Sequence, residues 1–397
     1  MAHTQTPPSL MFILQSKQPF HPAMAPSKVA CYLVFALSSC ILLCNAQILH
    51  PCEFDAIYQL GDSISDTGNL IRENPSSVYA KPPYGQSYGN GKPTGRCSDG
   101  LLMIDFFAQS AGIPFLEPYL KIKKGASNAA ANGVNFAVAG STALSARVLA
   151  TKGILNPLTV TSLSEQLDWM ETYFRALCSG DKDKCSEKLK TALFLVGEIG
   201  GNDYNYAFLE GKTIAQIKAM VPEIVQAIKT AVSRVIGFGA TRVVVPGNFP
   251  IGCIPIYLTS YKTKNSSAYD ELHCLKSLND VSTYHNNILQ QAIKDLRKEN
   301  PNVVVVYGDY FNAYLWIVRN AERLGFDAES VQKSCCGNGG DYNFSIMSMC
   351  GASGVPVCAN PNQHLSWDGI HSTQQAYKYM ADWLLRDIVS ELKCKTA

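Results

Sequence analysis

The chain of 397 residues carries a formal charge of +2, with 47% hydrophobic and 17% charged residues. This is the composition of a globular protein that is long enough to bury a large core in one or two domains. A nearly neutral chain without basic blocks lacks the electrostatic footprint of a nucleic-acid-binding protein, so we expect no nucleic-acid partner.

The N-terminal segment contains an apolar run from Val29 to Cys44, preceded by Lys28. Small residues follow the run up to Ala46, as signal peptidase requires. The pattern predicts a secretory signal peptide that is cleaved after Ala46. We therefore expect residues 1–46 to be an N-terminal extension with the signal peptide, and residues 47–397 to be the mature protein. A retained membrane anchor is the alternative, but the run is short for a bilayer.

The true start of translation is open between Met1 and Met24. Met24 opens a segment of more usual signal-peptide length, whereas a start at Met1 adds an unusually long stretch before the apolar run. Removal of the extension takes away Lys17 and Lys28 and leaves the mature chain with no net formal charge.

The cysteine content suits an oxidising compartment, because 14 cysteines are present and three of them leave with the signal peptide. We expect five disulfides and one unpaired thiol, which we assign to Cys97. The expected partners lie near the two chain ends (Cys52 and Cys394), around two polar loops (Cys178 and Cys185, Cys253 and Cys274) and in one crowded segment (Cys335, Cys336, Cys350 and Cys358). A zinc site in the crowded segment is the alternative, although no histidine accompanies these cysteines at finger-like spacing.

Two acceptor sequons begin at Asn265 and Asn343. In a secreted protein, Asn-X-Ser/Thr motifs are sites of N-glycosylation on surface loops. We expect both asparagines to be glycosylated.

From Ala56 onward, short apolar runs alternate with helical patterns. The apolar runs are continuous, which is typical of parallel strands covered on both faces. Strands are expected at residues 56–60, 134–138, 192–196, 242–245 and 303–307. Helical stripes follow at residues 163–177, 214–232, 275–296 and 377–392, the first opened by a capping box of Ser162 and Glu165. The alternation predicts a single α/β domain with a doubly wound sheet of about five parallel strands.

Two long irregular segments, Arg72 to Gly100 and Lys333 to Gln363, are rich in Gly, Pro, Asn and Tyr. They are too long to be simple connections between elements. Loops of this length usually form functional rims or covers pinned by disulfides.

Polar clusters follow the first three expected strands: Gly61 to Ser63, Ala139 to Ser141, and Gly200 to Asp203. A fourth cluster, Trp367 to Thr373, precedes the last helix. Ligands of an open parallel sheet bind outside the carboxyl ends of its strands. We therefore expect the four clusters to meet at one edge of the sheet.

A hydrolytic serine requires a base and a group that orients the base. Asp368 stands three residues before His371 in a glycine-containing turn, a spacing that can place the carboxylate beside Nδ1. A capping aspartate near a surface histidine is an equally common reason for this spacing. His273 and His285 fall in a helical pattern and are expected to be surface residues. Ester cleavage also needs donors for an oxyanion.

The available oxyanion donors are the backbone N–H groups of Ser63 and Gly140 and the side-chain amide of Asn202, one from each strand end. Asp62 and Asp66 are expected to hold the turn around Ser63 and to cap the helix that follows rather than to react. Their charge also disfavours a flavodoxin-like FMN site, because it would repel the phosphate.

The ordered blocks "LGDSISDTGN", "NFAVAGSTAL", "GGND" and "DGIHST" resemble those of the GDSL-type esterase/lipases, also called SGNH hydrolases. The resemblance implies a flavodoxin-like three-layer α/β/α sandwich without a cofactor or metal. It implies Ser63 as nucleophile, His371 as base and Asp368 as the residue that orients it. Ser63, Gly140 and Asn202 would form the oxyanion hole.

The stretches "PTGRCSDG", "GNFPIGC" and "CCGNGGDYNF" further resemble the secreted plant branch of this family. This likeness implies a secreted monomer that hydrolyses a small acylated metabolite, either an acetylated alkaloid or a phenolic ester, in the apoplast or vacuole. No membrane attachment is expected after signal cleavage, and no interfacial helix supports a lipase with a membrane lid. An acyltransferase that passes the acyl group to an alcohol or sugar acid is the alternative, and a non-catalytic binding protein is a third possibility.

Overall fold

The computed structural model describes residues 48–122 and 132–394. The expected signal peptide and its cleavage site after Ala46 lie outside the described residues. No described helix combines the length and the apolar character needed to cross a membrane.

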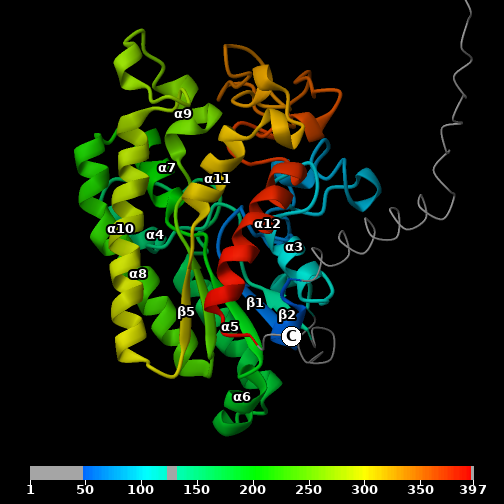
Figure 1. Ribbon diagram of the computed structural model, residues 1–397, viewed down its shortest axis with the longest axis vertical. Coiled ribbons are helices and arrows are strands. Elements are labelled where there is room, and N and C mark those ends of the chain that lie inside the picture. The colour runs from blue at the N-terminus through cyan, green and yellow to red at the C-terminus, as the bar shows by residue number, and fades with distance from the viewer. Residues whose placement is uncertain (1–47, 123–131, 395–397) are drawn as a thin grey trace, which may run out of the picture. The chain divides into compact units, whose positions relative to one another are not determined.

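Within the described residues, five strands form one parallel sheet in the order β2-β1-β3-β4-β5 (Figure 1). The strands are β1 (Ala56–Leu60), β2 (Gly133–Asn135), β3 (Ala192–Val196), β4 (Arg242–Pro246) and β5 (Val304–Gly308). This is the flavodoxin-like order, in which the chain reverses its direction of winding between β1 and β3. The prediction of an α/β fold with about five parallel strands is confirmed.

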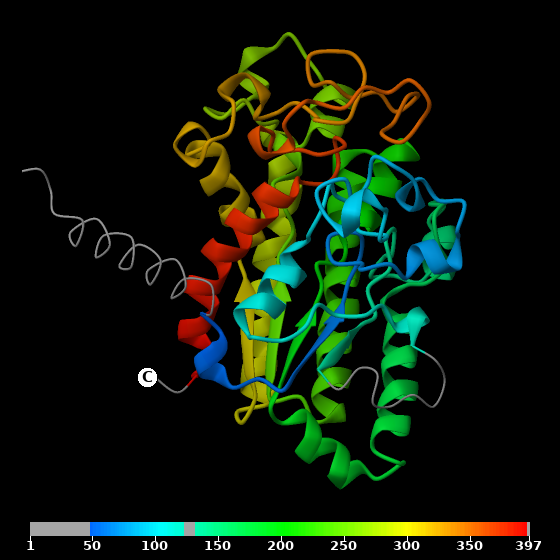
Figure 2. The same ribbon diagram turned by 90° about the vertical axis from the view of Figure 1, so that its right-hand side faces the viewer.

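Helices cover both faces of the sheet (Figure 2). One face packs against α5 (Leu163–Leu177), α8 (Ile214–Phe238) and α10 (Lys276–Glu299). The other packs against α3 (Met103–Ser110), α11 (Tyr310–Arg319) and α12 (Gln374–Glu391). Every residue of β1 and β3 is buried, which explains why these strands, apart from Gln59, are apolar without alternation. The remaining helices are α2 (Leu70–Glu73), α4 (Ala146–Thr151), α6 (Lys182–Leu189), α7 (Gly201–Leu209) and α9 (Pro255–Ser260).

Local capping sets the ends of the longer helices. At the start of α5, the backbone N–H of Ser162 donates to the Glu165 carboxylate at 2.8 Å, and the Ser162 hydroxyl accepts from the first turn. The predicted capping box is confirmed. Helix α8 begins with a second box of Thr213 and Gln216 and ends at Gly239, whose φ of 117° favours glycine.

Five disulfides join described cysteines, and Cys97 is a buried free thiol, as predicted. The three pairs expected around chain ends and loops form, and the crowded segment pairs Cys335 with Cys358 and Cys336 with Cys350. His364 lies within 4.8 Å of Cys335 and Cys358. Because the sulfurs are joined to each other, they are not available as zinc thiolates, and the structure does not support the zinc alternative.

The two long irregular segments pack together at the end of the sheet where the strands finish (Figures 1 and 2). Tyr79 and Tyr84 from the first segment share a small core with Cys335, Cys336 and Cys350 from the second. Both segments contribute to the lining of one pocket. Both segments therefore form part of the rim, and the second of them is pinned by two disulfides.

Candidate active site

Ser63 lies in the tight turn that follows β1 and lines this pocket. The turn leaves no room at Gly61, where a Cβ would lie 2.6 Å from Ser65 Oγ. Asp66 holds the turn, because its carboxylate accepts hydrogen bonds from the backbone N–H groups of Gly68, Asn69, Leu70 and Ala139 at 2.6 to 3.0 Å. The predicted structural role of Asp66 matches this network.

His371 and Asp368 form a buried pair at the start of the segment that leads into α12. Asp368 Oδ2 lies 2.7 Å from His371 Nδ1 and also accepts from the Tyr84 hydroxyl at 2.8 Å. Its Oδ1 accepts from the backbone N–H groups of Ile370 and His371. Burial alone would raise the pKa of Asp368, but His371 and these hydrogen bonds lower it below its ordinary value. The ionised carboxylate fixes the imidazole with Nδ1 toward Asp368.

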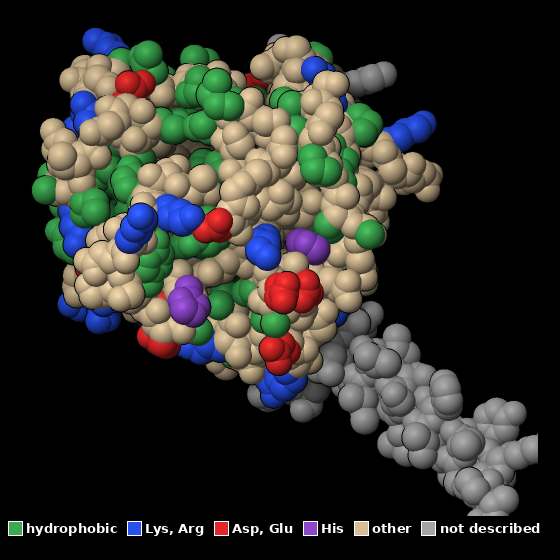
Figure 3. All heavy atoms as spheres, turned by 90° about the horizontal axis from the view of Figure 1, so that it is seen from above, with side chains coloured by type: hydrophobic (Ala, Val, Ile, Leu, Met, Phe, Trp, Pro, Cys, Tyr) green, Lys and Arg blue, Asp and Glu red, His purple; other side chains and the backbone are tan. Residues whose placement is uncertain are grey.

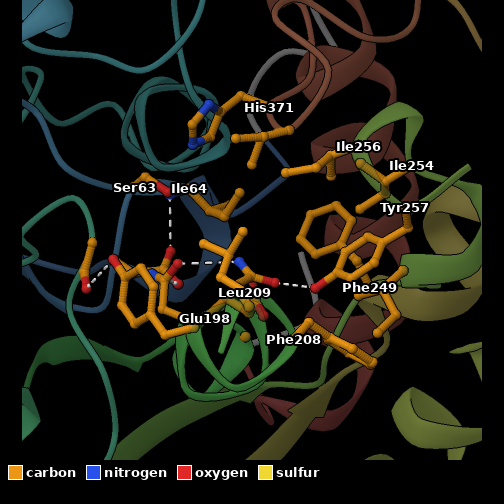
Figure 4. Close-up of a pocket in the computed structure, with 18 of the residues that line it drawn as sticks. Ser63, Ile64, Glu198, Phe208, Leu209, Phe249, Ile254, Ile256, Tyr257 and His371 are labelled. Carbon is orange, nitrogen blue, oxygen red and sulfur yellow. Dashed lines mark hydrogen bonds between the residues drawn. The ribbon is translucent and has the colours of Figure 1, made fainter. Parts of the chain in front are cut away.

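The imidazole of His371 lies over Ser63 (Figure 4). Both side chains line the same pocket, although they come from positions about three hundred residues apart in the chain. The ring of Tyr79 packs edge-on against the imidazole, with ring centroids 5.7 Å apart. With Nδ1 engaged by Asp368, the nitrogen left to face the serine is Nε2.

Gly140 and Asn202 reach the pocket from the loops after β2 and β3. Gly140 has a φ of 87°, and a Cβ there would lie 2.8 Å from Leu158, so both conformation and space require glycine. Its carbonyl accepts from Tyr206 Oη and Asn156 Nδ2, which leaves the orientation of the loop well defined. Asn202 Nδ2 donates to Ser141 O at 3.0 Å and to Asp62 Oδ2 at 3.2 Å.

The pocket has a volume of about 410 Å³ and mainly apolar walls. This lies within the usual range of small-molecule sites. Opposite Ser63 lie Ile254, Ile256 and Tyr257 (Figure 4). Large apolar side chains remain exposed at its rim: Val78, Leu158, Leu209, Tyr261 and Ile346. Figure 3 shows hydrophobic side chains at several places on this end of the molecule.

The geometry agrees with comparisons with known proteins. The family model described as GDSL-like lipase/acylhydrolase matches residues 57–384. The chain belongs to this family. Acetylajmalan esterase 2 of Rauvolfia serpentina is 47% identical over 368 residues, covering 91% of this chain and 98% of the relative. Acetylajmalan esterase 1 of the same species is also 47% identical, with 86% and 89% covered.

A GDSL esterase/lipase of Arabidopsis thaliana is 43% identical, and the alignment covers 94% of this chain and 100% of the relative. The expected family is therefore confirmed. This GDSL hydrolase is a carboxylic-ester hydrolase.

Three buried carboxyl groups lie near the pocket of this GDSL hydrolase and have raised pKa values. Burial raises the pKa of Asp62 to about 7, although the Ile64 N–H and His371 partly oppose the shift. Burial raises the pKa of Asp203 to about 7, and this carboxylate accepts from the N–H groups of Ala143 and Leu144. Burial, with a smaller contribution from Asp62, raises the pKa of Glu198 well above its usual range.

The sequence did not reveal Glu198 or the wall formed by residues 249–261 as parts of the site. An isolated glutamate and a run of apolar residues carry no recognisable catalytic pattern. The GDSL blocks locate the reacting atoms, whereas the walls depend on how distant loops pack. The only available signal was that Glu198 lies between the third strand and "GGND".

The prediction that His285 is a surface residue is wrong. His285 is 1% exposed, and its Nδ1 lies 2.7 Å from the hydroxyl of Tyr204 on α7. Burial lowers the pKa of His285 to about 4, so the ring is neutral near pH 7. His273 is exposed as expected, but it lies in a turn before α10 rather than in a helix.

The two sequons differ in their surroundings. Asn265 is exposed, and its Oδ1 accepts from the backbone N–H and hydroxyl of Ser267. Asn343 is half-buried, and its Nδ2 donates to Ser334 O at 2.7 Å. Glycosylation at Asn343 would therefore modify a nitrogen that already stabilises the loop.

Proposed function

We propose that this GDSL hydrolase is a secreted serine esterase that cleaves a small acylated plant metabolite through an acyl-enzyme on Ser63. The observation that carries the proposal is the buried His371–Asp368 pair, whose imidazole lies over Ser63 (Figure 4). Gly140 and Asn202 line the same pocket, where they can stabilise a developing oxyanion.

In the first step, Ser63 Oγ attacks the ester carbonyl carbon while His371 Nε2 takes the serine proton. The carbonyl oxygen becomes an oxyanion that accepts hydrogen bonds from the Ser63 and Gly140 N–H groups and from Asn202 Nδ2. Asp368 stabilises the imidazolium that forms. The bond between the acyl carbon and the alcohol oxygen then breaks, and His371 gives the proton to the leaving alcohol.

In the second step, water attacks the acyl carbon of the acyl-enzyme, and His371 Nε2 takes a proton from that water. The new tetrahedral intermediate then collapses: the bond between the acyl carbon and Ser63 Oγ breaks, His371 returns its proton to Oγ, and the carboxylic acid is released. No described lysine or arginine lines the pocket, so it offers no cation for a substrate carboxylate or phosphate. We therefore infer a neutral or cationic ester. The acetylajmalan esterases among the relatives favour an acetylated alkaloid, with a phenolic ester as the second candidate.

The proposed site of action is the secretory pathway, ending in the apoplast or vacuole. The apolar run before Ala46 supports this proposal, as do the five disulfides, which are stable in oxidising compartments. N-terminal sequencing of the protein from culture medium should begin at Gln47. Retention of residues 1–46 would contradict signal cleavage.

The esterase proposal is tested by labelling the glycosylated protein with a fluorescent fluorophosphonate and then assaying a panel of acetyl and hydroxycinnamoyl esters. Ser63→Ala should lose both label and turnover. Ser65→Ala is the matched control, because Ser65 lies in the same turn but its Oγ is an acceptor for Gln59 Nε2. If Ser63→Ala still labels, or if wild type cleaves no ester, the proposal fails.

A further inference from the structure

Glu198 is an ionisable residue of the pocket that the ester-cleavage steps do not use. It follows β3, is 5% exposed and lines the pocket. Among the described residues, no hydrogen bond or ion pair to its carboxyl group is formed. The ionisable groups that interact with it are Asp62, Tyr204, Tyr257 and Tyr310, none of which is a cation.

Asn248 provides an independent observation beside Glu198. It follows β4, is 2% exposed and lines the same pocket. Its backbone N–H donates to Asn286 Oδ1 at 2.7 Å, and its carbonyl accepts from Asn286 Nδ2 at 3.0 Å. The backbone of Asn248 is thus held firmly, while its buried Nδ2 has no hydrogen-bond partner among the described residues. The unpaired Nδ2 requires an acceptor atom, which an oxygen of a bound ester would provide, whereas Asn248 Oδ1 can accept from a donor group.

The two side chains converge on Gly201, the first residue of α7. A Cβ at Gly201 would lie 3.0 Å from Glu198 Oε1 and 3.3 Å from Asn248 Oδ1. Both acceptor oxygens therefore lie close to the Cα of Gly201 and near each other, with too little room for a side chain at this position. Two neighbouring acceptor oxygens suit a ligand that donates hydrogen bonds, and a carboxyl group among them suits a donor that carries positive charge.

The remaining walls are also suited to an organic cation. Phe208, Phe249, Tyr257 and Tyr314 line the pocket, and aromatic faces attract desolvated cations. The only charged side chains among the described lining residues are acidic, apart from His371. A bound cation would supply the counter-charge that Glu198 lacks.

We propose that Glu198 and the Oδ1 atom of Asn248 bind a protonated amine carried by the ester substrate, with Glu198 as its counter-ion. This inference rests on the proposed esterase function and names the substrate class for it. Glu198 is thereby a specificity-determining residue rather than part of the acyl-transfer chemistry.

Binding of the cation should also depend on pH. Burial favours the neutral form of Glu198 in the empty pocket and raises its pKa, so an amine must draw the carboxyl into its ionised form. Asp62, whose pKa is raised to about 7, adds a second negative charge near Glu198 as pH rises. The KM for an amine ester should therefore fall between pH 6 and 8, as long as the amine stays protonated.

The experiment compares two acetate esters of nearly equal shape, 2-(dimethylamino)ethyl acetate and 3-methylbutyl acetate. The first is protonated at neutral pH and the second is its uncharged isostere. Homologous pairs with three and four methylenes cover the unknown distance between ester and amine. Wild type should prefer the amine ester in at least one pair. Glu198→Gln should lower kcat/KM for that amine ester by about 10- to 100-fold and change the neutral ester by less than about threefold.

Glu210→Gln is the matched control, because Glu210 is exposed at the end of α7 and does not line the pocket. It removes the same charge and should leave kcat/KM unchanged for both esters. Gly201→Ala provides a second variant, whose methyl group would press against both oxygens and displace them. This variant should lower the ratio of kcat/KM for the amine ester to kcat/KM for the neutral ester. It therefore tests the inference even if Glu198→Gln does not fold.

Calorimetric binding of each ester pair to Ser63→Ala protein gives a readout without turnover. Preferential binding of the amine that is lost in Ser63→Ala/Glu198→Gln supports the inference, even if the esterase proposal fails. Ser63-dependent hydrolysis of both esters without any amine preference at any spacing overturns the inference and leaves the esterase proposal intact. Equal losses for both esters in Glu198→Gln would also overturn it, because they would indicate a structural role.

Discussion

Nδ1 of His371 lies 2.7 Å from Oδ2 of Asp368, and both residues are almost fully buried. This contact holds the imidazole in one orientation over Ser63, so the geometry of the site depends on it. Asp368→Asn should lower kcat for a soluble acetate ester by about 10³- to 10⁴-fold, because an amide in this position favours the wrong tautomer. A stopped assay with a long incubation measures the residual rate.

Tyr84→Phe is the matched comparison for Asp368, because it removes the 2.8 Å hydrogen bond to the same oxygen but leaves the carboxylate. A loss of roughly tenfold or less is expected for removal of a single hydrogen bond. If Asp368→Asn loses no more activity than Tyr84→Phe, the orienting role of Asp368 is wrong.

Asn202→Ala should reduce kcat by about 10²- to 10³-fold, the usual cost of losing one oxyanion donor. In the structure, both N–H groups of Asn202 point to acceptors, at 3.0 Å from Ser141 O and 3.2 Å from Asp62 Oδ2. We expect the longer contact to Asp62 to give way when the oxyanion forms. Full activity of Asn202→Ala, with unchanged KM, would remove Asn202 from the oxyanion hole.

Asp203 should make the fold less stable as pH rises. Its pKa is raised from 3.8 to about 7, so the folded chain binds a proton that the unfolded chain has lost between these values. The stability from this group is complete below about pH 4 and is lost as pH rises through about 7. His285 has the opposite effect: burial lowers its pKa from 6.5 to about 4, so its contribution to stability increases as pH rises between these values.

Asp203→Asn isolates this effect, because it leaves His285 unchanged. The melting temperature of wild type should fall by several degrees more than that of Asp203→Asn between pH 5 and pH 8. Scanning calorimetry at both pH values measures the difference. Parallel pH profiles for the two proteins would show that Asp203 does not titrate in this range.

Glycan occupancy should differ between the two sequons. Asn265→Gln should increase gel mobility of the secreted protein, because Asn265 is exposed in its loop. Asn343→Gln should change mobility less, since Asn343 is half-buried and its Nδ2 bonds to Ser334 O. Peptide mass spectrometry after glycosidase treatment determines occupancy at each site, and full occupancy of Asn343 alone would reverse this ranking.

Much of the fold follows from local patterns. The continuous apolar runs predict β1 and β3 with the bounds that the structure has, because strands buried on both faces are apolar along nearly their whole length. Strand β2 is shorter than predicted: it ends at Asn135, although the apolar run continues to Val138. Those last residues are buried without belonging to the strand.

The parts that could not be predicted depend on contacts between distant segments. The spacing of Cys335, Cys336, Cys350 and Cys358 permits three pairings, and only packing selects one. The burial of His285 could not be predicted for the same reason, since its partner Tyr204 lies on another helix. Glu198 belongs to no recognisable sequence motif, and its proposed role in binding becomes visible only when the fold places Asn248 beside it.

The central claim, an acyl-enzyme on Ser63, is tested most directly by trapping the intermediate. The protein is mixed with excess 4-nitrophenyl acetate, quenched in acid within milliseconds to seconds, digested and analysed by peptide mass spectrometry. We predict an acetyl group on Ser63 in wild type and none on the corresponding peptide of Ser63→Ala. Turnover without an acetylated Ser63, or with the acetyl group on another residue, would contradict the account.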